Sequence, residues 1–455
     1  MRYIGILIVL MSIPAFYIWL RTSRRNYNYA YFAIGLLPFI QTAVNLDASI
    51  WNIGGLGYVK GLVLTLLDTL CLAILATSRF KIIRLPFTGV FAAYIVATVL
   101  SIFQAPGFFA PFSYTFQLLR AFTIFLTVAT VVQQSGALRH IANGLTVGAI
   151  IQGIAALTQR LGGDFQADGT MGHQNLTGMA LHFSTLPLLA MLLAGNKSKL
   201  YLGGIAGGLT AVALGASRGS IAALVVGIAL LLFCSLIRQT TARKFGVIGV
   251  LTLMLAAASP ILYEGLAKRF DSVTAVTKVD EEREAFKRAA QAMFADNPLG
   301  VGANRYTFVG ITEDYSERAG VTWAGASRSA VVHHLYWLTA AELGWFGLFT
   351  LPPLLLWVII RGFAFSFTRT RDPRGDVVLG FTCAVAVTAW QSFYEWVFVL
   401  STMNYMFAIA AGIIAGSIMQ RKQQLASVRR TGLLSGGGVR YGEPVHAHAE
   451  AIGSR

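Results

Sequence analysis

Residues 219–237 read GSIAALVVGIALLLFCSLI and carry no charged side chain. A helix of this length crosses the hydrocarbon core of a bilayer, which is about 30 Å thick. Similar apolar runs recur along the 455-residue chain, in which 55% of residues are hydrophobic and 12% are charged. A soluble protein of this length needs more charge to cover its surface. The sequence therefore predicts an all-α polytopic membrane protein.

The apolar runs predict twelve or thirteen membrane crossings. They lie at about 3–20, 29–45, 60–77, 86–104, 114–133, 138–158, 176–195, 199–216, 219–237, 244–262, 331–360, 377–394 and 397–418. The run at 29–45 is short and could be re-entrant. The first run ends in RTSRR without a small-residue cleavage site, so we expect a retained helix or signal anchor. The three cysteines fall inside apolar runs, which predicts packing residues rather than disulfides.

The net charge of +16 sits mainly in short connections between the apolar runs and in the C-terminal tail. Short basic connections face the cytoplasm under the positive-inside rule, and no DNA-binding motif accompanies the charge. Placing them inside predicts that the other connections face outward. These outward connections are 46–59, 105–113, 159–175, 216–219 and 263–330.

This pattern divides the chain into an N-terminal transmembrane bundle (1–262), an outward helical loop (263–330), C-terminal transmembrane helices (331–420) and a cytoplasmic tail (421–455) that we expect to be disordered. The loop contains DEEREAFKRAAQAMFADNP, a soluble helix that Asp280 is expected to cap and Asn297-Pro298 to end. The tail is polar and contains SGGG, so we interpret its His446 and His448 as mobile surface residues and not as metal ligands.

Two arginines are candidates for function on the outward side. Arg218 lies in LGASRGSIAAL between two apolar helices, where the small neighbours let helices approach closely. Its guanidinium could face a cavity, or it could extend to lipid phosphate. Arg283 lies at the edge of the apolar face of the soluble helix, where it could face the bundle or form a local ion pair with Glu282.

Two adjacent histidines precede the apolar run that begins near 331. If His333 and His334 are helical, their side chains diverge by about 100° and cannot bind one metal ion together. His173, in GTMGHQN, is the nearest other outward histidine, so a metal site is disfavoured. Near a helix N-terminus the dipole favours a neutral imidazole, which is the form that a general base needs. The alternative is a pair of interfacial histidines without a role.

Three ionisable residues fall inside predicted spans: Asp68, Arg120 and Glu342. Such residues usually face the interior of a helix bundle, where they pair or line a path. The sequence does not identify the pairs.

Four segments together resemble the O-antigen ligase and O-antigen polymerase superfamily, over residues 150–350. They are GTMGHQNLTGMALHFSTLPL (169–188), LGASRGSIAALVVG (214–227), REAFKRAAQAMFADNPLGVGANRY (283–306) and HHLYWLTAAELGWFGLF (333–349). The last is similar to a family signature of histidine, a small polar residue, nine residues, glycine, two residues and glycine. His334 stands where the family has asparagine, serine or glutamine, and Leu348 stands where ligases often have threonine.

The resemblance implies a GT-C-like bundle in the bacterial inner membrane that transfers a glycan on its periplasmic face. The donor would be a glycan on undecaprenyl diphosphate, without a metal ion or other cofactor. By resemblance, Arg218 and Arg283 would hold the diphosphate and His333 would deprotonate the acceptor hydroxyl, with inversion at the anomeric carbon. Guanidinium groups suit phosphate oxygens because they bind them bidentately and stay charged. The other expected substrate-binding residues are His334, Arg288 (the alternative to Arg283), Asn175, His173, Arg305 and Arg120.

The acceptor remains open. A ligase would pass the glycan to a lipid A-core sugar, and a polymerase would pass it to the next lipid-linked repeat of an O-antigen or exopolysaccharide. A transporter or lipid flippase is a remoter alternative, which predicts paired interrupted helices in two related halves. A structural scaffold leaves the outward arginines and histidines unexplained. We expect no nucleic-acid partner under any of these hypotheses.

Overall fold

The structure is a computed structural model that describes residues 2–40, 44–52, 57–78, 85–253, 273–322, 330–368 and 372–434, together with residues 256, 259 and 327. It is almost entirely helical, as the sequence predicts, with one two-stranded antiparallel sheet of β1 (Asp47–Asn52) and β2 (Gly61–Thr65). The main helices are α1 (Arg2–Thr22), α2 (Arg24–Leu36), α3 (Leu66–Thr77), α4 (Thr88–Leu100), α5 (Phe109–Val131), α6 (Ala137–Leu161), α7 (Gln174–Leu193), α8 (Lys199–Leu214), α9 (Arg218–Arg238), α11 (Val273–Asp296), α15 (Leu335–Leu348), α16 (Leu351–Thr368), α17 (Arg374–Gln391) and α18 (Ser401–Leu434).

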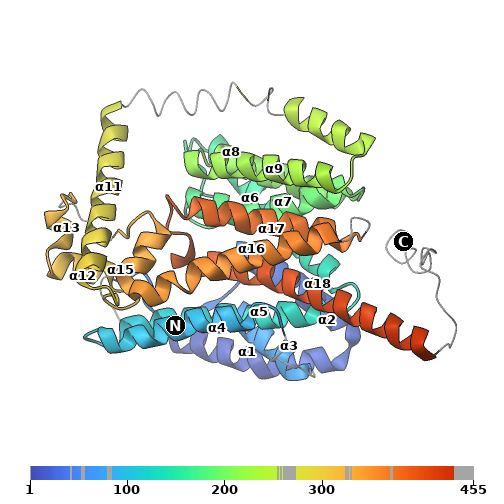
Figure 1. Cartoon of the computed structure of the whole chain (residues 1–455), viewed down its shortest axis with the longest axis horizontal. Helices are drawn as coiled ribbons and strands as arrows, with labels where there is room; N and C mark the ends of the chain where they lie inside the picture. The colour runs from blue at the N-terminus through green and yellow to red at the C-terminus, as the bar shows by residue number, and fades with distance from the viewer. Residues whose placement is uncertain are drawn as a thin grey trace.

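Most of these helices run side by side, and α11 crosses one end of the bundle next to the short helices α12 (Tyr306–Thr312) and α13 (Tyr315–Arg318) (Figure 1). Among the described residues, seven helices are long and apolar enough to cross a membrane: α1, α5, α6, α7, α9, α16 and α18. Shorter apolar helices at 66–77, 88–104 and 199–214 fall within three more of the predicted crossings, but they are shorter than these seven. The fold is that of a polytopic α-helical membrane protein.

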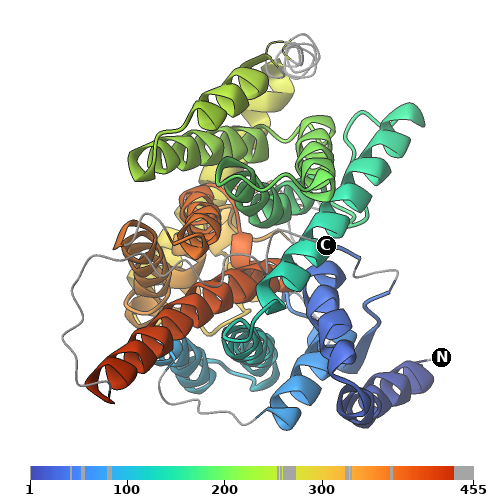
Figure 2. The same ribbon diagram turned by 90° about the vertical axis from the view of Figure 1, so that its right-hand side faces the viewer.

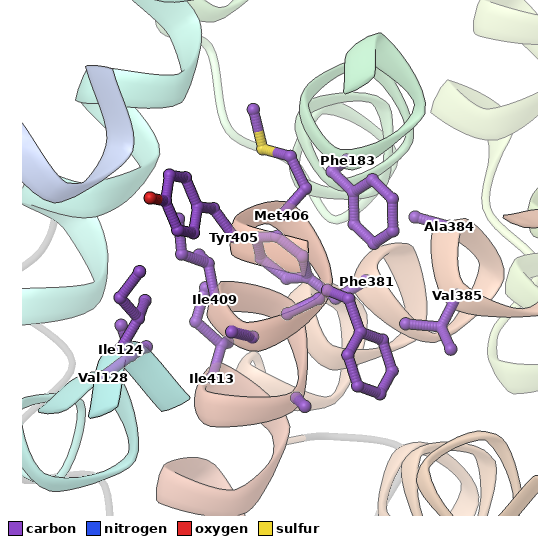
Figure 3. Close-up of a cluster of buried hydrophobic side chains, with 14 of the residues drawn as sticks. Ile124, Val128, Phe183, Phe381, Ala384, Val385, Tyr405, Met406, Ile409 and Ile413 are labelled. Atoms are coloured by element: carbon purple, nitrogen blue, oxygen red, sulfur yellow. The ribbon is translucent and has the colours of Figure 1, made fainter. Parts of the chain in front are cut away.

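The first half of α18 lies at the centre of the bundle, where residues 402–418 are all buried. Tyr405, Met406, Ile409 and Ile413 of this helix pack against α5, α7 and α17 (Figure 3). Viewed from the end at which α18 leaves the bundle, its inner part lies among the other helices and its outer part projects from them (Figure 2). A helix segment with mostly apolar residues on all sides is stable only when neighbours cover it, so this part of α18 needs contacts with several helices.

The predicted outward connections meet at one end of the bundle. The 46–59 and 263–330 connections touch where Asn304 Oδ1 accepts the Val59 N–H at 2.9 Å. The 105–113 connection joins them, since the Asn304 amide donates to the Ala110 carbonyl at 3.3 Å. At the other end, Arg238 pairs with Asp376 at 3.0 Å and Gln420 donates to the Gln133 carbonyl at 3.3 Å. The connections therefore separate into two sets, as the sequence predicts.

Two predicted crossings differ in the structure. The run at 29–45 does not form one spanning helix, because α2 has 13 residues, which span about 20 Å, and it passes into a 3-10 turn at Leu37–Phe39. The run at 331–360 is divided between α15 and α16. Gly344, inside α15, has φ 58° and ψ −147°, which is a conformation that favours glycine and interrupts the helix.

The soluble helix and the tail also differ from expectation. The helix α11 begins at Val273, so Asp280 lies within it and does not cap it, whereas it ends at Asp296 before Asn297-Pro298 as predicted. The tail does not become irregular at residue 421, because α18 continues to Leu434 and Arg421 Nη1 donates to the Phe365 carbonyl at 2.9 Å. Residues 263–272, the end of the predicted 244–262 crossing, and His446 and His448 lie outside the described residues.

Arg120 and Asp68 form an ion pair inside the bundle. The Nη2 and Nε atoms of Arg120 lie 2.7 and 2.8 Å from Asp68 Oδ2, and both side chains are buried. Asp68 also accepts the Thr65 N–H at 2.8 Å, which closes a capping box at the start of α3. The ring of Tyr405 on α18 lies under the guanidinium at 5.3 Å. The pair thus joins α3, α5 and α18, and this position gives Arg120 a structural role.

Replacing Arg120 with methionine should destabilise the protein, because it leaves the Asp68 carboxylate buried without its cation. Breaking a buried pair from one side costs about 3–5 kcal/mol. We expect a lower Tm for Arg120→Met in detergent and a partial recovery in the Asp68→Asn/Arg120→Met double variant. An unchanged Tm in the single variant would contradict the structural role. Activity that stays lost in a double variant with recovered stability would restore Arg120 as a substrate ligand.

Candidate active site

A buried carboxylate, Glu395, gathers side chains from three distant segments. It lies between α17 and the 3-10 turn Val397–Val399, and 4% of its side chain is exposed. Its Oε1 accepts a hydrogen bond from Asn175 Nδ2 of α7 at 3.0 Å, and its Oε2 lies 3.3 Å from His333 Nδ1. Arg283 Nη2 of α11 lies 3.8 Å from Oε1. Asn175, His333 and Arg283 were each expected to serve the site, whereas Glu395 was not.

The contact with Glu395 fixes the tautomer of His333. An ionised carboxylate only accepts hydrogen bonds, so beside it a neutral His333 donates from Nδ1–H and keeps the lone pair on Nε2. The His333 ring also meets the ring of Trp396 edge-on at 5.9 Å, and 23% of the His333 side chain is exposed. A partly exposed imidazole with one nitrogen held by a carboxylate is the arrangement of a general base with an orienting partner.

His334 has a different environment from His333. Neither histidine is helical: α15 begins at Leu335, and His334 is its N-cap with extended backbone (φ −164°). His334 Nδ1 accepts the N–H of Trp337 at 3.3 Å, and burial lowers the pKa of His334. The His334 side chain thus caps α15, and Glu395, not His334, holds the ring of His333. Asparagine and serine, two of the residues that the similar family signature has here, are also preferred N-cap residues.

His173 caps a second helix at this site. Its Nδ1 accepts the N–H of Asn175 at 3.2 Å at the start of α7, and its ring meets Trp396 edge-on at 6.1 Å. Burial lowers the pKa of His173, an effect that Glu395 opposes. The imidazole is therefore neutral at pH 7. Within the part of the chain that the structure describes, no group of three or more histidine, cysteine or acidic side chains is placed to hold a metal ion.

Arg218 begins the helix that borders Glu395. It is the first residue of α9, which Ser217 caps by accepting the Ser220 N–H at 3.4 Å. The next residue, Gly219, packs against Tyr394: a Cβ there would lie 3.1 Å from the ring and 3.9 Å from Glu395 Oε1. The N-termini of α7, α9 and α15 therefore converge around Glu395. Helix N-termini favour anions, so this end of the bundle suits a negatively charged ligand.

The other expected ligands lie apart from Glu395. Arg288 donates to the Ala319 carbonyl at 2.9 Å, so Arg283 is the arginine of α11 that reaches the cluster. Arg305 is buried and donates to the Val301 carbonyl at 3.1 Å. Arg120 binds Asp68 within the bundle. Each of these three guanidinium groups binds a partner of its own instead of Glu395.

Glu395 and Trp396 were missed because the sequence shows them only as a break between two apolar runs. One signal was available in the sequence. Glu395 and Trp396 form the very short outward connection between two apolar runs, at 377–394 and 397–418. Carboxylates at such positions are costly unless they are paired, and that cost could have indicated a role.

Comparison with known proteins gives one match, to part of the chain. A search of the curated proteins finds no match. A family model described as O-antigen ligase matches residues 203–351, which include Arg218, Arg283 and His333. The matched region begins in α8 and ends at the first residue of α16, so it covers the start of α9, the outward loop and α15. Residues 203–351 are therefore similar to the O-antigen ligase family, and the apolar helices make the chain a multi-pass membrane protein.

Proposed function

We propose that the protein transfers a glycan from undecaprenyl diphosphate to a sugar hydroxyl at the periplasmic face of the bacterial inner membrane. The observation that carries the proposal is the shared contact of His333 and Arg283 with Glu395. It unites a base and a cation that lie far apart in the sequence. The basic connections at the opposite end of the bundle support a periplasmic position for this end.

His333 acts as the general base. Its Nε2 takes the proton of the acceptor hydroxyl as the hydroxyl oxygen attacks the anomeric carbon from the face opposite the diphosphate. The new glycosidic bond forms as the bond to the diphosphate oxygen breaks, which inverts the anomeric centre. Glu395 holds the ring through Nδ1 and stabilises the imidazolium that forms.

The diphosphate leaves with negative charge, which the cations at this end stabilise. Arg283 is 37% exposed and its pair with Glu395 is long, so its remaining N–H donors can bind phosphate oxygens. Arg218 adds a second guanidinium at the N-terminus of α9. Charge that develops on a leaving group is stabilised most by donors that are already in place.

The acceptor separates two versions of this function. We favour a ligase that uses lipid A-core, because the matching family model is described as O-antigen ligase. The alternative is a polymerase for O-antigen or exopolysaccharide with the same chemistry. Deletion of the gene, with the polysaccharides analysed on gels, tests both. Lipid-linked chains that accumulate while lipid A carries none indicate a ligase, and single repeats without long chains indicate a polymerase. Unchanged polysaccharides would refute both.

His333→Ala should reduce transfer by about 10²–10⁴-fold, the contribution of a general base, while the protein still inserts and folds. The measurement is transfer of a labelled glycan from its polyprenyl diphosphate in purified, reconstituted protein. His140→Ala, at the start of α6, is the matched control and should leave the rate unchanged. Normal transfer by His333→Ala would exclude its role as the base.

Glu395→Gln should lower kcat by about tenfold or more, because the amide lacks the charge that stabilises the His333 imidazolium. The same assay measures it, and a normal amount of folded protein separates the loss from misfolding. Glu284→Gln on the exposed face of α11 is the control. A kcat that matches the wild type would show that Glu395 only packs.

A further inference from the structure

The helix that carries Arg283 is joined to the helix that follows His333 at a second place, away from Glu395. The segment after α11 runs along the end of α15: the Val301 N–H donates to the Ala341 carbonyl and the Gly302 N–H to the Glu342 carbonyl, both at 2.9 Å. In return, the Trp345 N–H donates to the Pro298 carbonyl at 3.1 Å. These bonds fix the end of α11 on α15.

The break at Gly344 makes this junction possible. In an unbroken helix the Trp345 N–H would donate to the Ala341 carbonyl, four residues earlier. The positive φ of Gly344 turns this N–H to Pro298 and leaves the Ala341 carbonyl for Val301. A Cβ at Gly344 would overlap the Pro298 carbonyl oxygen, and one at Gly300 would overlap the Glu342 carbonyl oxygen. The backbones approach too closely for any side chain.

The buried carboxylate of Glu342 on α15 binds the segment that follows α11. Its Oε2 accepts the Asn304 N–H at 2.8 Å and the Tyr58 hydroxyl at 2.6 Å, and its Oε1 accepts the Tyr306 N–H at 2.9 Å. Glu342 is 2% exposed. The ion pairs found among the described residues do not include it, so directional N–H and O–H donors hold it. Such donors define a position more narrowly than a mobile lysine would.

Tyr306 extends the junction to the site. While its N–H binds Glu342, its hydroxyl donates to the Phe286 carbonyl at 2.8 Å, and the ring is buried. Phe286 lies three residues after Arg283 on α11, close to one turn of the helix. A continuous path of hydrogen bonds therefore runs from α15 through Glu342 and Tyr306 to the turn of α11 that presents Arg283.

We propose that Glu342 is a positioning residue that holds α11 and α15 in register, so that Arg283 and His333 face the same substrate. This inference rests on the proposed function for its substrate. Glu342 touches neither reacting group; it acts through Tyr306 and the backbone of α15. Glutamine cannot replace it, because its NH₂ group would face the N–H of either Asn304 or Tyr306.

The test compares Glu342→Gln and Tyr306→Phe with the wild type in the full-length, reconstituted protein. Tyr306→Phe removes only the hydrogen bond from the hydroxyl to the Phe286 carbonyl and keeps the hydrogen bond from the backbone N–H to Glu342. We expect both variants to lower kcat/KM for the polyprenyl diphosphate donor by about tenfold or more per folded molecule, as loss of a precise geometry does. Glu317→Gln, an exposed position on α13, is the matched control and should retain full activity.

A second readout does not depend on catalysis. Nitroxides at Glu284→Cys on α11 and Phe349→Cys after α15 report the distance between the two helices by double electron–electron resonance; both positions are exposed. We expect a narrow distribution in the otherwise wild-type protein and a broad or shifted one with Glu342→Gln. An unchanged distribution, or unchanged kcat/KM per folded molecule in both variants, would overturn the proposal. If the wild-type protein transfers no glycan from the donor, the proposed function is refuted. The distance measurement would still test the junction in that case.

Discussion

The site depends on the cost of burying one carboxylate. Glu395 sits at the end of an apolar bundle with little access to water, where an unpaired charge is strongly unfavourable. It is stable there because an amide, an imidazole and a guanidinium reach it from three other segments. The same requirement brings those groups together, so the chemistry of the site follows from the electrostatic needs of a single acidic residue.

The N-termini of three helices also determine where the residues of the site lie. His173, Ser217 and His334 cap α7, α9 and α15 with side-chain acceptors. Each cap lies next to a residue of the site: Asn175 follows the first, Arg218 the second, and His333 precedes the third. Because capping fixes where each helix begins, it also fixes where these neighbours lie. The positive ends of three helix dipoles then meet at the place proposed here for the diphosphate.

Much of the architecture could be predicted because lipid imposes local rules. Long apolar runs must be helical to satisfy their backbone, and basic residues mark one side of the membrane, so the chain's class and its two sets of connections follow from composition. The end of α11 at Asn297-Pro298 was also predictable, since proline cannot continue a helix. The division of 331–360 was not, because hydropathy does not register a glycine that turns the backbone through its left-handed region.

The sequence by itself determined that this is a helical membrane protein and that Arg218, Arg283 and His333 were the residues to consider. The tertiary structure decided what each ionisable residue binds. It paired Arg120 with Asp68 and bound the buried Arg305 to the Val301 carbonyl. It also set Arg283 instead of Arg288 beside Glu395. The physical reason is the separation along the chain of the residues that interact. Membrane insertion and capping depend on consecutive residues, whereas a buried charge is stabilised by any group that helix packing brings within about 4 Å.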